Sequence, residues 1–346
     1  MVFAYGTNAV RVVFGAGALA ALPDELARAG FRKVLLLTTP GRWADREPVA
    51  RLVGGELAGE FTGARLHVPV SVVAEARAVV DRVRPESLLA YGGGSAIGLG
   101  KALAFETRLP LAAVATTYSG SEMTVIWGNS DGQVKRTFRD AAVAPRLVIY
   151  DPDLTVALAP EVKAASGMNA IAHCVEAEYA PERGPVTSWF AMEGIRRLAS
   201  ALPIVVRAPD DGAARADALY GAHLAGRALD MTSMGLHHKL AHIMGGSFGL
   251  NHAEAHAALL PWVAAWNAQA APEAMERIAA ALGVAVAADG LALLSRELGI
   301  RNLGQLGFST DSIPRAAEMA TQLAFPNPRA VDADGVRWIL ERAIAG

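Results

Sequence analysis

The amino-acid sequence predicts two domains, an α/β domain with a parallel sheet at residues 1–153 and an all-α domain at residues 154–346. Before Asp151, short continuous apolar runs alternate with amphipathic segments, which is typical of strands buried between two layers of helices. After Asp153, alanine-rich segments with a helical period continue to Gly346. A length of 346 residues also favours two domains over one.

Four apolar runs are the candidate strands of the first domain. They occupy residues 34–37, 87–91, 111–115 and 147–150, and turn or polar residues flank each of them. In the second half, the prolines divide the sequence into candidate helices: Pro160, Pro203, Pro209, Pro261 and Pro272. No fixed-period repeat or low-complexity tract interrupts either half.

Charge and cysteine content exclude several functions. The chain has 32 Lys and Arg against 34 Asp and Glu, so no overall positive field attracts nucleic acid or an anionic membrane. The single cysteine, Cys174, excludes an intramolecular disulfide and a thiolate zinc site, and it fits a reducing compartment. The sequence shows neither a signal peptide nor an uninterrupted apolar stretch of about 18 residues. We therefore expect a soluble cytoplasmic protein with no nucleic-acid or membrane partner.

A glycine loop follows the candidate strand at residues 87–91. The loop comprises Gly92, Gly93, Gly94 and Ser95, and it opens a helix. Without β-carbons, backbone N–H groups can approach a pyrophosphate, and the helix N-terminus adds a partial positive charge. This placement favours nucleotide binding over a plain turn. Lys101 does not stand in the register of a P-loop lysine, so phosphoryl transfer is disfavoured.

A second polar loop, at residues 116–122, follows the candidate strand at residues 111–115. It offers the hydroxyl groups of Thr116, Thr117 and Ser121. Because the carboxyl ends of parallel strands share one edge of a sheet, we expect these hydroxyls to reach the same crevice as the glycine loop. A polar surface loop with no ligand is the alternative.

Five of the eight histidines fall within residues 237–256. A spacing of four residues separates His238 from His242, His252 from His256 and, upstream, Asn169 from His173. Residues at this spacing share one face of a helix and can converge on a single ligand. Imidazole transfers protons and binds metals near neutral pH. A single histidine in an apolar helix is usually a packed core residue, but three couples on separate segments indicate a reaction centre.

Linked motifs run through the whole chain in the order that a known superfamily has them. They lie at residues 11–17, 92–101, 116–122, 166–173, 237–261 and 327–329. By these motifs the chain resembles the iron-containing, or group III, alcohol dehydrogenases, and within them it is most similar to the maleylacetate reductases. The resemblance implies the dehydroquinate synthase-like fold: a dinucleotide-binding α/β domain, an all-α C-terminal domain and a cleft between them. It also implies a homodimer.

The metal-dependent members of that superfamily bind a divalent ion through one Asp and three His, and this chain departs from that set. The four positions are held here by Asn169, His173, His238 and His252. The amide removes the only anionic ligand, which lowers the affinity for a dication. We therefore expect a vestigial site and no obligatory metal. Gly98 in place of Asp, the run of residues 236–239 and His256 in place of Asn are further traits of the maleylacetate reductases.

The resemblance implies reduction of the carbon–carbon double bond of maleylacetate, an unsaturated oxo-dicarboxylate, to 3-oxoadipate by NADH or NADPH. The expected cofactor-binding residues are Thr38, Gly92, Gly93, Gly94, Ser95, Thr116, Thr117 and Ser121. Residues 37–40 contain no carboxylate that would bind a ribose hydroxyl or repel a 2′-phosphate, so we expect both cofactors to serve.

A small dianionic substrate needs positive charge and polar contacts in its site. Lys239, between two histidines of the cluster, is one candidate cation and a candidate catalytic residue. Arg139, in the basic stretch of residues 135–139, is another, with a solvated turn as the alternative for that stretch. Asn169 and Tyr118 are further candidate substrate contacts.

The imidazoles are expected to replace the metal of the alcohol dehydrogenases. Hydride delivery to an enone leaves an enolate, so a donor must stabilise the oxygen and an acid must protonate carbon. We assign the donor role to His173, His238 and His252. His242 and His256 are alternative proton donors, and His67, His223 and His237 are expected to pack structurally.

Three other functions remain open. A three-histidine metal alcohol dehydrogenase would reduce aldehydes or ketones, a lyase related to dehydroquinate synthase would use the same fold, and a cofactor-binding protein would have no turnover. The substrate is open as well, because Trp262 stands where the family commonly has His and Trp266 follows one helical turn later. Unless both pack in the core, they favour a related enone or keto acid in another pathway.

Overall fold

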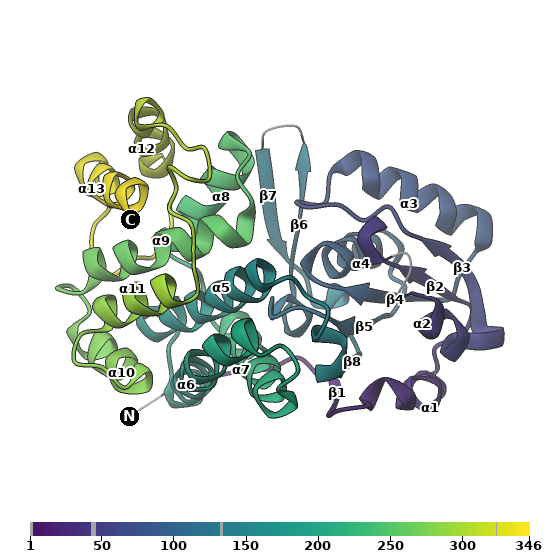
Figure 1. Ribbon diagram of the computed structural model, residues 1–346. Coiled ribbons are helices and arrows are strands. Elements are labelled where there is room, and N and C mark those ends of the chain that lie inside the picture. The colour runs from purple at the N-terminus through teal and green to yellow at the C-terminus, as the bar shows by residue number, and fades with distance from the viewer. Residues whose placement is uncertain (1–2, 43–45, 132–133, 323) are drawn as a thin grey trace. The chain divides into compact units, whose positions relative to one another are not determined.

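The computed structural model describes residues 3–42, 46–131, 134–322 and 324–346, and it contains two compact units (Figure 1). An α/β unit spans residues 8–157, and a helical unit comprises residues 158–346 together with residues 3–7. The boundary predicted after Asp153 therefore lies four residues later, and residues 3–7, expected in the α/β domain, belong to the helical unit. There the ring of Phe3 lies 3.6 Å from the position that a Cβ atom at Gly184 would take.

The α/β unit is built on a six-stranded sheet in which every neighbouring pair is parallel. Its strands are β1 (Arg11–Phe14), β2 (Val34–Leu37), β3 (Leu57–Phe61), β4 (Ser87–Gly92), β5 (Leu111–Ala115) and β8 (Leu147–Tyr150), in the order β1-β8-β5-β4-β2-β3. The four predicted strands are confirmed, and every residue in them is buried. β1 and β3 were not among the predicted strands. Both are partly exposed edge strands, the apolar run of β1 is only three residues long, and Gly59 and Glu60 interrupt that of β3.

Helices cover both faces of this sheet. Figure 1 shows α1 (Leu22–Arg28) and α2 (Arg46–Val53) on one face, and α3 (Val70–Val83) and α4 (Gly94–Thr107) on the other. Strand β6 (Ile126–Asp131) pairs antiparallel with β7 (Val134–Arg139), and the ring of Trp127 packs between Phe105 and Phe138. The basic stretch at residues 135–139 is therefore a strand and not a solvated turn.

The helical unit is arranged around α5 (Pro160–Tyr179), which is buried continuously from Lys163 to Glu178. The other helices are α6 (Pro185–Arg207), α7 (Gly212–Asp230), α8 (Leu236–Phe248), α9 (His252–Asn267), α10 (Pro272–Leu282), α11 (Ala287–Glu297), α12 (Ile313–Thr321) and α13 (Ala333–Ala345). Pro160 and Pro272 begin helices, as the sequence predicted, and Pro209 lies between α6 and α7. No single helix in the described part of the chain is long and apolar enough to cross a bilayer.

Two of the five prolines do not separate helices, which corrects the prediction. Pro203 lies inside α6 and Pro261 inside α9. Both residues are buried in the helical unit. A proline removes one backbone hydrogen bond from a helix, and here the packing of the neighbouring turns outweighs that loss.

We expect Gly167→Ala to destabilise the helical unit. A Cβ atom at Gly167 would overlap the Cγ and both Cδ atoms of Leu202, where α5 packs against α6. Overpacking of this kind costs about 1–3 kcal/mol, to be measured as a lower free energy of unfolding in urea. Gly212→Ala is the matched control, because the nearest atom to its Cβ would be the flexible end of Arg215 at 3.7 Å. Equal stability of the two variants would contradict the prediction.

Candidate active site

The predicted cofactor residues lie at one edge of the sheet, where the direction of the chain connections reverses. From β2 the chain continues to its outer neighbour β3, whereas from β4 it continues to β5 on the other side. In parallel sheets such a reversal opens a crevice at the carboxyl ends of the two strands. Thr38 follows β2 at this edge, and the glycine loop follows β4. Thr116 follows the adjacent β5.

The residues at this edge fit a nucleotide cofactor. The hydroxyl oxygens of Thr38 and Thr116 are buried and have no hydrogen-bond partner in the described part of the chain. Gly94 is exposed, and a Cβ atom there would have 3.9 Å of clearance from Ser119. Gly93, the residue before α4, makes no side-chain cap to the amides of the first turn. Unused backbone donors at a helix N-terminus are the usual partners of a phosphate group.

Lys101 has a structural role here that sequence reasoning missed. Its ammonium is fully buried and donates to the carbonyl oxygens of Ser121 at 2.5 Å and Ile126 at 2.8 Å, and to the hydroxyl of Thr124 at 2.9 Å. Lys101 therefore ties the middle of α4 to the loop that follows Thr116. A lysine among apolar residues in the third turn of a helix was the signal in the sequence.

A buried carboxyl group lies in the same loop. Glu122 accepts hydrogen bonds from the hydroxyl of Tyr150 at 2.7 Å and from Ser119 at 3.3 Å. Burial raises the pKa of Glu122, and these hydrogen bonds and the charge of Lys101 oppose that rise. These hydrogen bonds hold the buried side of the loop in place. Thr117 and Ser121 are partly exposed in the same loop.

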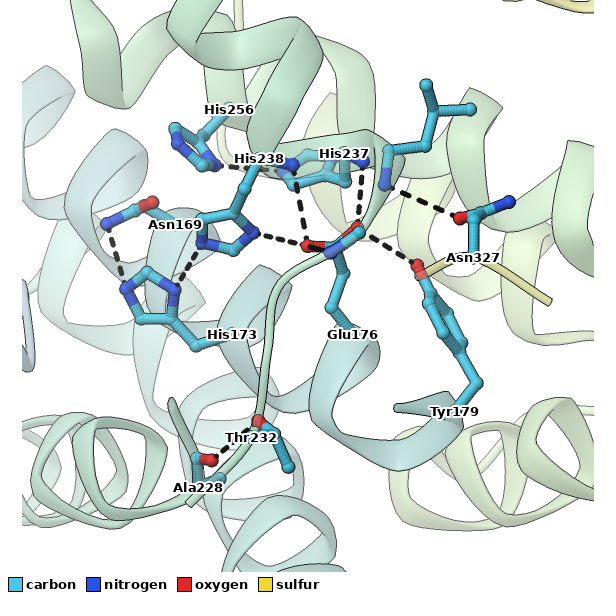
Figure 2. Close-up of polar contacts among 12 residues, drawn as sticks. Asn169, His173, Glu176, Tyr179, Ala228, Thr232, His237, His238, His256 and Asn327 are labelled. Carbon is cyan, nitrogen blue, oxygen red and sulfur yellow. Dashed lines mark hydrogen bonds and ion pairs between the residues drawn. The ribbon is translucent and has the colours of Figure 1, made fainter. Parts of the chain in front are cut away.

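In the helical unit, α5, α8 and α9 bring the predicted imidazoles together (Figure 2). Nδ1 of His173 lies 2.8 Å from Nε2 of His238. The ring of His256 lies 4.6 Å from that of His238 and 4.4 Å from that of His252. His242 completes the group, with its ring 5.3 Å from that of His252. We call these five residues the histidine cluster; their catalytic roles stay predictions.

His237 contacts this cluster more closely than the sequence predicted. It was expected to pack away from the site, and it is indeed fully buried. However, its Nε2 atom lies 2.9 Å from Nδ1 of His256, because α9 brings His256 across the first turn of α8. Burial lowers the pKa of His237 to about 3 and the pKa of His256 well below its usual value, so both rings are neutral at pH 7.

Glu176 is a functional candidate that sequence reasoning missed. Its buried carboxylate accepts from Nδ1 of His238 at 2.6 Å and from the backbone N–H groups of Gly235 at 3.0 Å and His237 at 2.8 Å (Figure 2). Burial raises the pKa of Glu176, and these backbone hydrogen bonds oppose the rise. The spacing of Asn169, His173 and Glu176, which places all three on one face of α5, was the available signal.

Asn169 and the three imidazoles at the former metal-ligand positions do not fit a bound metal in this arrangement. Nε2 of His238 is engaged with His173, and the side-chain nitrogen of Asn169 lies 3.4 Å from Nε2 of His173. No group of three or more His, Cys, Asp or Glu side chains in the described ranges is placed to hold an ion.

The predicted substrate contacts are distributed over both units. Lys239 is half-buried on α8 and has no ion pair with any residue that the structure describes. In the α/β unit, Arg139 is exposed at the end of β7, in register with Ile126, and Tyr118 is fully buried. Complete burial of Tyr118 leaves it no exposed surface for a substrate in this conformation.

Several further residues of the helical unit pack structurally. Trp266 is buried in the apolar core of the helical unit and carries the Arg329 guanidinium over its ring at 4.5 Å; Trp262 packs partly against the same core. Cys174 is buried, and burial raises the pKa of its thiol. His223, on α7, stacks against Tyr220. Burial, with a smaller effect of the Arg227 charge, lowers the pKa of His223 to about 4.

Comparison with known proteins gives one family for both units. Residues 9–152 match the family model "Iron-containing alcohol dehydrogenase", and residues 163–344 match "Fe-containing alcohol dehydrogenase family, C-terminal". A maleylacetate reductase of Burkholderia cepacia is 47% identical over 345 residues, covering 99% of this chain and 98% of that protein. A maleylacetate reductase of Sphingobium indicum is 44% identical, with coverages of 100% and 98%. The crystal structure of maleylacetate reductase from Agrobacterium tumefaciens has a TM-score of 0.94 and 40% identity, with coverages of 100% and 99%.

We expect His223→Gln to change how stability depends on pH. The folded protein holds the pKa of His223 at about 4, below its usual 6.5, so the unfolded chain binds more protons between these values. Neutral His223 therefore contributes fully to the free energy of unfolding of the wild type above pH 6.5. As the pH falls towards 4, this free energy decreases by up to about 1.4 kcal/mol per pH unit. The difference in free energy of unfolding, wild type minus variant, should fall between pH 7 and pH 4. A stability difference that stays constant between pH 7 and pH 4 would contradict the prediction.

Proposed function

The chain belongs to the iron-containing alcohol dehydrogenase family, and within it to the maleylacetate reductases, and from this membership we propose that it reduces maleylacetate to 3-oxoadipate with NADH or NADPH. It is an oxidoreductase. The observation that carries the proposal is the identity of 42–47% to curated maleylacetate reductases over almost the entire chain. A homodimer, which the resemblance implies, and a cytoplasmic location, which the sequence composition favours, stay predictions.

The chemistry of the proposed substrate agrees with the groups in the helical unit. Reduced nicotinamide, when bound, supplies the hydride that adds to the β-carbon of the enone. The protein then has to stabilise an enolate oxygen and deliver a proton to carbon. Lys239, a half-buried residue of α8, supplies positive charge for a dianion, and the imidazoles of His252 and His256 lie on the neighbouring helix α9.

We propose that this reaction needs no bound metal. The amide of Asn169 replaces the anionic ligand, and the contact with Nδ1 of His173 at 2.8 Å occupies Nε2 of His238. Three neutral imidazoles hold a dication weakly unless their lone pairs converge on it. The stabilisation of developing charge is therefore assigned to protein donors.

The expected result is that purified protein, treated with a strong chelator and then desalted, consumes NADH when freshly generated maleylacetate is added. The measurement is the loss of nicotinamide absorbance, in parallel with NADPH and with an aldehyde in place of maleylacetate. Activity that disappears on chelation and returns with iron or zinc would establish the metal alcohol dehydrogenase instead. Folded protein that consumes neither cofactor with maleylacetate would refute the substrate.

We also expect Gly94→Ala to weaken cofactor binding without weakening the fold. A Cβ atom at Gly94 has room within the protein, so any loss of affinity reports crowding of the bound cofactor. The dissociation constant for NADH, measured by fluorescence titration, should rise about tenfold or more, as expected where a glycine allows the backbone to approach a phosphate. The control is Gly212→Ala, also at the first position of a helix. An unchanged dissociation constant would remove Gly94 from the cofactor site.

A further inference from the structure

Glu176 connects the start of α8 to the histidine cluster. Helix α8 begins at Leu236 without a side-chain cap from the residue before it. The carboxylate of Glu176, on α5, performs that function from another helix by accepting the backbone N–H groups of Gly235, His237 and His238 at 3.0, 2.8 and 3.4 Å. A carboxylate at a helix N-terminus is stabilised by the helix dipole and by these donors. Oε2, the oxygen that contacts the ring of His238, accepts from the backbone N–H groups of Gly235 and His238, so Glu176 is an acceptor towards the groups that face it.

This fixed acceptor determines where the protons of two imidazoles lie. Nδ1 of His238 is 2.6 Å from Glu176, so it carries the hydrogen, and Nε2 of His238 is left as an acceptor. Nδ1 of His173, at 2.8 Å from that acceptor, must be the next donor. Nε2 of His173 is then an acceptor, and it faces the side-chain nitrogen of Asn169 at 3.4 Å. In this series of hydrogen bonds, from Asn169 through His173 and His238, each donor therefore points towards Glu176 (Figure 2).

We propose that Glu176 is a positioning residue that fixes the neutral Nδ1–H tautomers of His238 and His173. Both N–H bonds are then used inside the protein and cannot donate to a substrate oxygen. This proposal replaces the donor roles predicted for His173 and His238. The developing negative charge is received instead by Lys239 and the imidazoles of α9. The catalytic consequence rests on the proposed function, whereas the tautomers do not.

Asn169 has a defined function in this arrangement. Its amide nitrogen donates to His173, which a carboxylate at position 169 could not do. Its carbonyl oxygen is buried and has no partner in the part of the chain that the structure describes. An amide in place of a carboxylate at position 169 therefore supplies the first donor in this series of hydrogen bonds, at the end far from Glu176.

The tautomers are measured directly in the intact wild-type protein. Protein labelled with ¹⁵N in histidine, with signals assigned from His173→Gln and His238→Gln variants, is studied by long-range ¹H–¹⁵N correlation at neutral pH. We expect both rings as the Nδ1–H tautomer, with Nε2 unprotonated. An Nε2–H tautomer or an imidazolium at either residue would overturn the proposal. This outcome is independent of whether maleylacetate is the substrate.

Kinetics test the positioning role. Glu176→Gln keeps an oxygen acceptor but loses the carboxylate and turns an NH₂ group towards one backbone donor. This loosens the first turn of α8, which carries Lys239. We therefore expect kcat to fall about 10–100-fold, the usual effect of losing a group that orients active-site side chains. KM for maleylacetate should change little. Tyr179→Phe is the control, because its hydroxyl makes only a long contact of 3.5 Å with the same carboxylate, and its kcat should stay within about twofold of the wild type. Folded Glu176→Gln protein with wild-type kcat would overturn the role.

Discussion

A buried carboxylate on the central helix is the group on which the arrangement of the histidine cluster depends. Glu176 lies in α5, which is buried along almost its whole length, and it holds the first turn of α8 through backbone donors. The same first turn carries His237, whose ring contacts His256 on α9. One acceptor thus fixes α8 against α5, and α8 in turn orients a side chain of α9. A buried carboxyl group is tolerated at such a site because several donors surround it.

Most of the α/β unit could be predicted from the sequence, because a strand buried on both faces must be continuously apolar. The runs at residues 34–37 and 111–115 gave that signal, whereas the edge strand β3 is half-exposed and gave none. The glycine loop was found because glycine next to a strand has a specific backbone use. Pro261 was misread, since the sequence does not show that packing keeps a helix intact around it.

In the active site, the sequence indicated which residues gather but not how they are bonded. The i,i+4 couples place imidazoles on shared helix faces, and the cluster forms as that spacing requires. The roles of Glu176 and Lys101 depend on partners twenty or more residues away, which only the fold brings near. Local spacing contains no information on such contacts. For the same reason the direction of the hydrogen bonds between His173 and His238 could not be read from the sequence.

The division of the chain into units has a consequence for how the protein forms during synthesis. Residues 3–7 pack with helices that begin after residue 158, so the α/β unit is inserted within the helical unit. Domains generally fold in the order in which the ribosome produces them. The inserted sheet is therefore available first, and the leading segment must wait for partners made more than 150 residues later. The two units are also joined by two peptide connections, so a single backbone cleavage between them leaves them covalently linked.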